Sequence, residues 1–114
     1  MDWFYDTLTP LYEKGKVSPL AYQAMKDILE HLDGKYHVNC AYTGPVENAN
    51  LCPLVISKSS KKGVVAQVEI LDYGAVQVMF VDVTTDVSES AVYSVSQRSA
   101  AISAALNVFS RVSS

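Results

Sequence analysis

The chain has 114 residues, a length that suits one domain with one hydrophobic core. Apolar residues make up 49% of the chain and charged residues 18%, which excludes a disordered, charge-rich protein. The formal net charge of -3 disfavours broad electrostatic attraction to nucleic acid or to an acidic membrane.

The sequence contains neither a membrane span nor a secretory signal. No apolar run approaches the roughly 20 residues that a helix needs to cross a bilayer. The first residues also lack the basic, apolar and small-residue regions of a signal peptide. Cys40 and Cys52 are too few for a disulfide-stapled secreted scaffold. We therefore expect a cytoplasmic protein in which both thiols are free and buried, with a single bridge between them as the alternative.

The N-terminal third predicts helices. Residues 2–14 have helix-compatible apolar spacing, but Pro10 predicts a break, so we expect a short helix followed by a single turn. Ser18 is a suitable N-cap, and Pro19 is tolerated at the first helical position. The sequence therefore predicts a second helix over residues 18–33, with its apolar stripe formed by Leu20, Met25, Ile28, Leu29 and Leu32.

Beyond residue 35 the apolar period changes to two, which predicts strands. We expect four of them, over residues 36–42, 51–58, 64–71 and 75–83. Gly44 and Pro45 end the first of these, and the last two form the clearest hairpin. Residues 75–83 are apolar on both faces, which is typical of a central strand.

Residues 86–96 fit two structures. Asp86 and Glu89 have the spacing of a helical capping box, whereas the β-branched and serine-rich residues that follow favour a fifth strand. We favour the strand, with a helix that begins near Ser96 and buries Ile102, Ala105, Leu106, Phe109 and Val112. The fold class is then α+β. It is a single α+β domain over residues 1–114, in which an antiparallel sheet of about four to five meander strands packs one face against the N-terminal helices and the C-terminal helix.

Residues able to bind a metal or act as nucleophiles are few and badly spaced. His31, His37, Cys40 and Cys52 are suitable zinc ligands, but no C-x-x-C or H-x-x-x-H pair is present. His37 and Cys40 are also predicted on opposite faces of one strand. No cysteine or serine stands in a recognisable nucleophile motif. We therefore expect no metal, no cofactor and no catalytic set.

The segment 57–63 is the one local concentration of positive charge. Lys58, Lys61 and Lys62 stand there among serines, so their ammonium groups and the hydroxyls could hold a phosphate or another small anion. The order of residues is not that of a phosphate-binding Walker loop. A solvated hairpin tip whose lysines discourage aggregation is the simpler interpretation.

Aromatic residues crowd the N-terminus. Trp3, Phe4, Tyr5 and Tyr12 would suit a protein-binding surface, and packing of this segment onto the core is an equally good interpretation. The small residues of the 99–105 run would also allow a homodimer through symmetric helix pairing. The expected function is a non-catalytic protein–protein interaction module of adaptor, chaperone or inhibitor type. The alternative is a binder of a small anion or nucleotide that uses the 57–63 loop.

Overall fold

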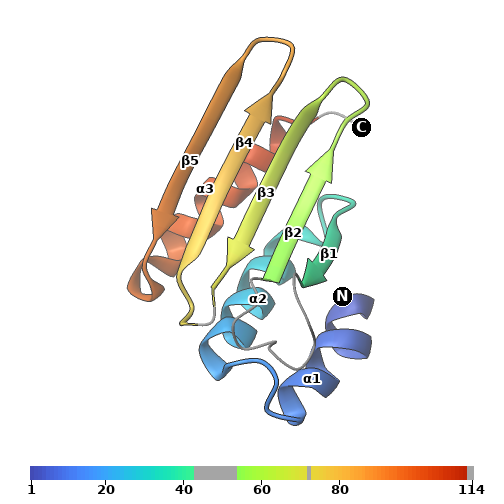
Figure 1. Cartoon of the computed structure of the whole chain (residues 1–114), viewed down its shortest axis with the longest axis vertical. Coiled ribbons are helices and arrows are strands. Elements are labelled where there is room, and N and C mark those ends of the chain that lie inside the picture. The colour runs from blue at the N-terminus through green and yellow to red at the C-terminus, as the bar shows by residue number, and fades with distance from the viewer. Residues whose placement is uncertain (43–53, 72, 113–114) are drawn as a thin grey trace.

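A computed structural model describes residues 1–42, 54–71 and 73–112 (Figure 1). In this part of the chain, helical segments flank a five-stranded antiparallel sheet, so the expected α+β class and meander are confirmed. The helical segments are η1 (Phe4–Leu8), α1 (Thr9–Glu13), α2 (Pro19–Leu32), η3 (Val95–Gln97) and α3 (Arg98–Ser110). The strands are β1 (Asn39–Tyr42), β2 (Leu54–Ser59), β3 (Val64–Ile70), β4 (Val76–Asp82) and β5 (Val87–Tyr93).

The strands lie in the sheet in the order in which they occur in the chain, β1-β2-β3-β4-β5. Both long helices lie on the same side of this sheet (Figure 1). There α2 contacts β2 and β3, while α3 contacts β3, β4 and β5, and the two helices also contact each other. α2 and α3 therefore cover the same face of the sheet, as the sequence predicted, and none of the described helices covers the other face.

The core forms where the alternating strand residues meet the helices. The register places Ala66 opposite Phe80 and Val68 opposite Val78, and all four side chains are buried. Met25 and Ile28 from α2 and Phe109 from α3 pack against them and are fully buried. Each large side chain of this kind stabilises the fold by roughly 1.5–3 kcal/mol, so the sheet and both helices depend on a common core.

The predicted break at Pro10 is wrong. The chain stays helical from η1 into α1 through a π turn, in which the Thr9 N–H donates to the Phe4 carbonyl. In a regular α-helix the ring of Pro10 would clash with the carbonyl four residues earlier. A π turn contains one extra residue, which changes the position of that carbonyl. Pro10 then lies in the first turn of α1, where its missing N–H costs little.

The predicted helix over residues 18–33 is confirmed as α2. Its cap forms as expected, because the Ala21 N–H donates to Ser18 Oγ at 3.1 Å. The strand that follows is shorter than predicted and begins at Asn39. The reason is that the Tyr36 N–H still bonds to the Leu32 carbonyl, at 2.9 Å, and so belongs to the end of the helix.

The strand interpretation of residues 86–96 is also confirmed. Asp86 has a positive φ of 58° and lies in the turn before β5 rather than capping a helix. The capping box forms later, where the Ser94 N–H donates to the Gln97 side-chain oxygen at 2.9 Å. The predicted features at Gly44, Pro45, residues 51–53 and Cys52 lie outside the described residues.

Gly74 provides a test of how the β3–β4 turn fits against the helices. Its φ is +87°, and a Cβ atom there would lie 3.2 Å from Leu20 Cβ and 3.3 Å from Val95 Cγ2. We expect Gly74→Ala to lower the free energy of unfolding by about 1–3 kcal/mol in urea denaturation. Gly34→Ala is the matched control, because nothing lies within 4 Å of a Cβ at that position. Equal effects of the two substitutions would contradict this account.

Candidate functional site

The most accessible regular element of the sheet is its edge strand β5. Among the described strands it pairs with β4 alone, in a register that runs without interruption from Val76 opposite Tyr93 to Asp82 opposite Val87. All of its residues except Tyr93 are exposed. The backbone N–H and C=O groups of alternate residues along these seven therefore face away from the sheet.

β5 lacks most of the features that usually protect an edge strand from pairing with other chains. It contains no proline and no lysine, and its register with β4 has no bulge. The opposite edge differs, because β1 is only four residues long. Short edge strands offer few backbone groups to a partner, so the two edges of the sheet are not equivalent.

The one charge on β5 is compensated within the chain. Arg111, just after α3, donates from its two guanidinium nitrogens to the two carboxylate oxygens of Glu89. The guanidinium carbon of Arg111 also lies 3.9 Å from the centre of the Phe80 ring. Bonding to Arg111 holds the pKa of Glu89 below its usual value. The edge therefore presents little net charge to an approaching chain.

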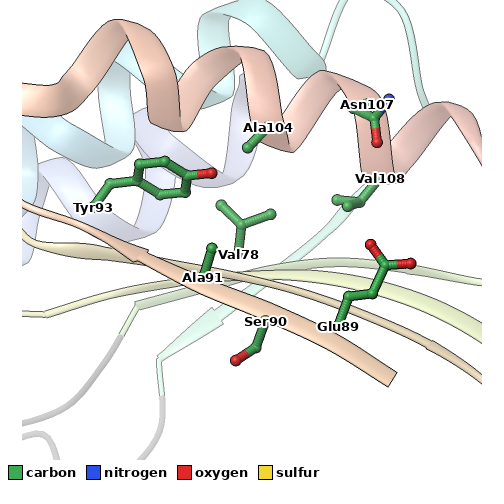
Figure 2. Close-up of a pocket in the computed structure, with 8 residues that line it drawn as sticks. All are labelled: Val78, Glu89, Ser90, Ala91, Tyr93, Ala104, Asn107 and Val108. Carbon is green, nitrogen blue, oxygen red and sulfur yellow. The ribbon is translucent and has the colours of Figure 1, made fainter. Parts of the chain in front are cut away.

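A groove runs between β5 and α3 and has a volume of about 250 Å³. Ala91 and Ala104 are small, which leaves the space between strand and helix partly unfilled. Figure 2 shows Val78 and Ala91 pointing toward α3, whereas Ser90 points to the other side of the strand. The groove is lined by Val78, Glu89, Ser90, Ala91, Tyr93, Ala104, Asn107 and Val108.

The face of the sheet opposite the helices, called the open face here, is not covered by any described helix and is poor in charge. By register, the described strands place one charged residue on it, Glu69. Val81 and Val92 are exposed there to 36% and 63% of their surface. The other residues of this face are Asn39, Ala41, Val55, Ser57, Ser59, Val65, Gln67, Gln77, Met79, Ser88 and Ser90. This face adjoins the β5 edge through Ser88, Ser90 and Val92.

The structure places the N-terminal aromatic residues mainly in packing positions. Phe4 is fully buried, with its ring centre 4.9 Å from that of Tyr22. The ring of Tyr12 stacks on Tyr22 at 4.0 Å, and Trp3 is partly buried against the core. Tyr5 is the exposed member of the set, at 54%. A partner could reach Tyr5 directly, whereas Phe4 holds the N-terminal helix on α2.

The three lysines of the 57–63 segment have different surroundings. The Lys58 ammonium donates to the Val112 carbonyl at 2.8 Å and lies 5.2 Å from the centre of the Tyr36 ring. Lys58 therefore links β2 to the end of the C-terminal helix. Lys61 and Lys62 lie in the turn between β2 and β3 and are exposed.

The histidines and Cys40 are likewise separate. Nδ1 of His31 lies 2.7 Å from the Asp27 carbonyl oxygen, and His37 is exposed. Burial raises the pKa of the free Cys40 thiol to about 11, which makes the thiolate a minor species at neutral pH. Within the described residues, no three acidic, histidine or cysteine side chains gather where they could hold a metal ion.

No family model, no curated protein and no solved structure matches this chain. Among the described residues, no helix has both the length and the apolar character that crossing a membrane requires. The geometry of β5 is therefore the main guide to function. The sequence contained part of this signal, since residues 87–93 have neither lysine nor proline, but the edge position depends on the order of the strands.

Phe4 and Tyr5 form a matched pair for testing the aromatic segment. We expect Phe4→Ala to lower the free energy of unfolding by about 3–5 kcal/mol, because it leaves a cavity in the core. Tyr5→Ala removes an exposed ring whose edge-to-face contact with Phe4 contributes at most about 1.5 kcal/mol. Urea denaturation of both variants measures the difference. A small effect of Phe4→Ala would contradict the burial of this ring.

The Glu89–Arg111 ion pair predicts a dependence of stability on pH. Because the pKa of Glu89 is lowered in the folded state, its contribution is present above the unfolded pKa and is lost as the pH falls through the folded value. We expect Glu89→Gln to be less stable than the natural chain near neutral pH, with a gap in the free energy of unfolding that closes as the pH falls below the usual range of a glutamate carboxyl group. Urea midpoints of both proteins across this range measure the gap. A constant gap would exclude the carboxylate as its source.

Proposed function

We propose that this chain is a non-catalytic protein–protein interaction module, of adaptor, chaperone or inhibitor type, that binds its partner by strand addition at β5. The observation that carries the proposal is a seven-residue edge strand without proline, lysine or bulge. Such an edge offers backbone N–H and C=O groups in a row, and an extended segment of another chain can pair with them. The binding affinity then comes largely from main-chain hydrogen bonds.

The groove between β5 and α3 would supply selectivity. Alternate side chains of an added strand point to the helix side of the sheet, where the groove beside Ala91 and Ala104 is partly unfilled. Its volume of about 250 Å³ suits small or medium apolar side chains rather than an aromatic pair. The remaining side chains of the added strand would extend the open face beside Ser90 and Val92.

The alternative function, binding of a small anion or nucleotide by the 57–63 segment, has weaker support. Its three lysines would have to act together, and the Lys58 ammonium is already bonded to the Val112 carbonyl. Lys61 and Lys62 remain as two exposed charges on a turn, and exposed charges of this kind are strongly screened by salt.

Val92 and Val81 provide a matched test of the proposed function. Both are exposed valines on the open face, but Val92 lies on the edge strand and Val81 on the interior strand β4. The natural chain, Val92→Lys and Val81→Lys are each tagged and purified by affinity from the organism of origin. The amount of bound protein is then compared among the three. We expect Val92→Lys to lose the bound protein and Val81→Lys to retain it, because a lysine on an edge strand opposes pairing.

Hydrogen exchange of the purified complex then locates the contact. Strand addition predicts that the outward-facing amides, those of alternate residues in 87–93, become protected when the partner binds, while the amides of β1 do not change. Loss of the partner from Val81→Lys alone would move the docking site to the open face. The proposal fails if the natural chain, on its own or in the cell, associates with no protein at all.

A further inference from the structure

We propose that the strand which pairs with β5 is β5 of a second copy of this chain, so that two sheets join across a two-fold axis into one continuous sheet. This inference rests on the proposed function and names the partner. Its basis is that two β5 strands can pair with each other in one symmetric register. In that register their backbone groups, their side chains and their charges are all compatible.

Symmetry restricts the ways in which two β5 strands can pair. In an antiparallel ladder, alternate residues direct their N–H and C=O groups to the same edge, and residues opposite each other are of the same kind. When two copies of one strand pair, the numbers of opposite residues therefore differ by an even number. As a result, one residue always lies on the two-fold axis, opposite the same residue of the other copy. With Ser90 at that position, all seven residues of Val87–Tyr93 are paired. With Glu89 or Ala91 there, only five residues of the strand are paired.

The side chains favour the register centred on Ser90. Glu89 then lies opposite the partner's Ala91, whereas a register centred on Glu89 would place two carboxylates directly opposite each other. At the ends of the strand, Val87 meets the partner's Tyr93, a favourable pairing of a β-branched with an aromatic residue. At the centre, the two Ser90 hydroxyls can bond to each other on the open face.

Charge does not oppose this pairing. The two Glu89 side chains would be diagonal neighbours across the axis, and two unpaired carboxylates there would repel each other. Each Glu89 is instead held by two hydrogen bonds from Arg111 of its own chain. The association therefore brings together two compensated ion pairs rather than two bare negative charges.

The helix beside β5 leaves room for a second copy. Joining two β5 edges brings the two α3 helices toward each other on the same side of the combined sheet. The surface of α3 that lines the groove carries Ala104 and Asn107, and Ala100 and Ser103 nearby are exposed and small. Small side chains allow the helices to approach closely and to close the two grooves between them.

Substitutions at Ser90 and Ser88 test both the dimer and its register. Both are exposed serines of β5 that lie on the open face by register. In the proposed dimer, Ser90→Lys places two ammonium groups side by side, whereas two lysines at position 88 stand four residues apart along the strand, roughly 14 Å. The second distance exceeds the Debye length of about 8 Å at physiological salt, so Ser88→Lys is the matched control.

The association of the full chain is measured by two methods. One is light scattering coupled to size-exclusion chromatography, and the other is analytical ultracentrifugation. We expect the natural chain to form a dimer. Ser90→Lys and Ser90→Glu should each raise its Kd by about a hundredfold or more, because like charges then meet at the axis. Ser88→Lys adds a lysine to the edge strand without a charge pair at the axis, so it should raise the Kd by about tenfold or less. An equimolar mixture of Ser90→Lys and Ser90→Glu should recover the dimer, because opposite charges then meet at the axis. Recovery also demonstrates that both variants are folded.

Three outcomes would overturn this inference. They are a monomeric natural chain at high concentration, equal effects of Ser90→Lys and Ser88→Lys, and a mixture of the two Ser90 variants that stays monomeric. The natural chain could instead be monomeric and still bind another protein, with this binding lost in Val92→Lys but kept in Val81→Lys. That result would overturn the homodimer and leave the proposed function in place.

Discussion

Burial of one face of the sheet is the constraint on which the rest of this structure depends. Side chains alternate between the two faces along β2, β3 and β4. This alternation places Ile56, Val68 and Val78 on the same side, where α2 and α3 cover them. Because the described residues form no second layer of helices, they leave the other face and the long β5 edge accessible. The features that we assign to binding thus follow from the same arrangement that forms the core.

The contacts between distant segments hold this one-sided arrangement together. Arg98 at the start of α3 bonds to Asp27 of α2 at 2.8 Å, and Lys58 of β2 bonds to the Val112 carbonyl beyond the end of α3. Arg111 attaches the same end of the chain to β5 through Glu89. Several charged side chains that the sequence presents as free surface groups therefore position α3 over the sheet. These links fix the spacing between α3 and β5, and with it the groove beside the edge strand.

The function that we propose depends on backbone groups rather than on reactive side chains. An exposed strand edge binds through N–H and C=O groups that every residue carries, so its sequence needs no distinctive motif. A protein that binds in this way therefore needs no catalytic, metal-binding or phosphate-binding motif. The useful signal in residues 87–93 is the lack of proline and lysine.

The sequence by itself determined the helix over residues 18–33, the meander and the α+β class, because apolar period, caps and turn residues act over short distances. It could not determine that Phe4 lies in the core, that Pro10 is accommodated by a π turn, or that Lys58 is bonded to the end of α3. Each of these depends on a contact or a backbone geometry that local spacing does not specify. The edge position of β5 belongs to the same group. Which strand has a neighbour on one side only is decided when the strands assemble, and that order is a property of the tertiary structure.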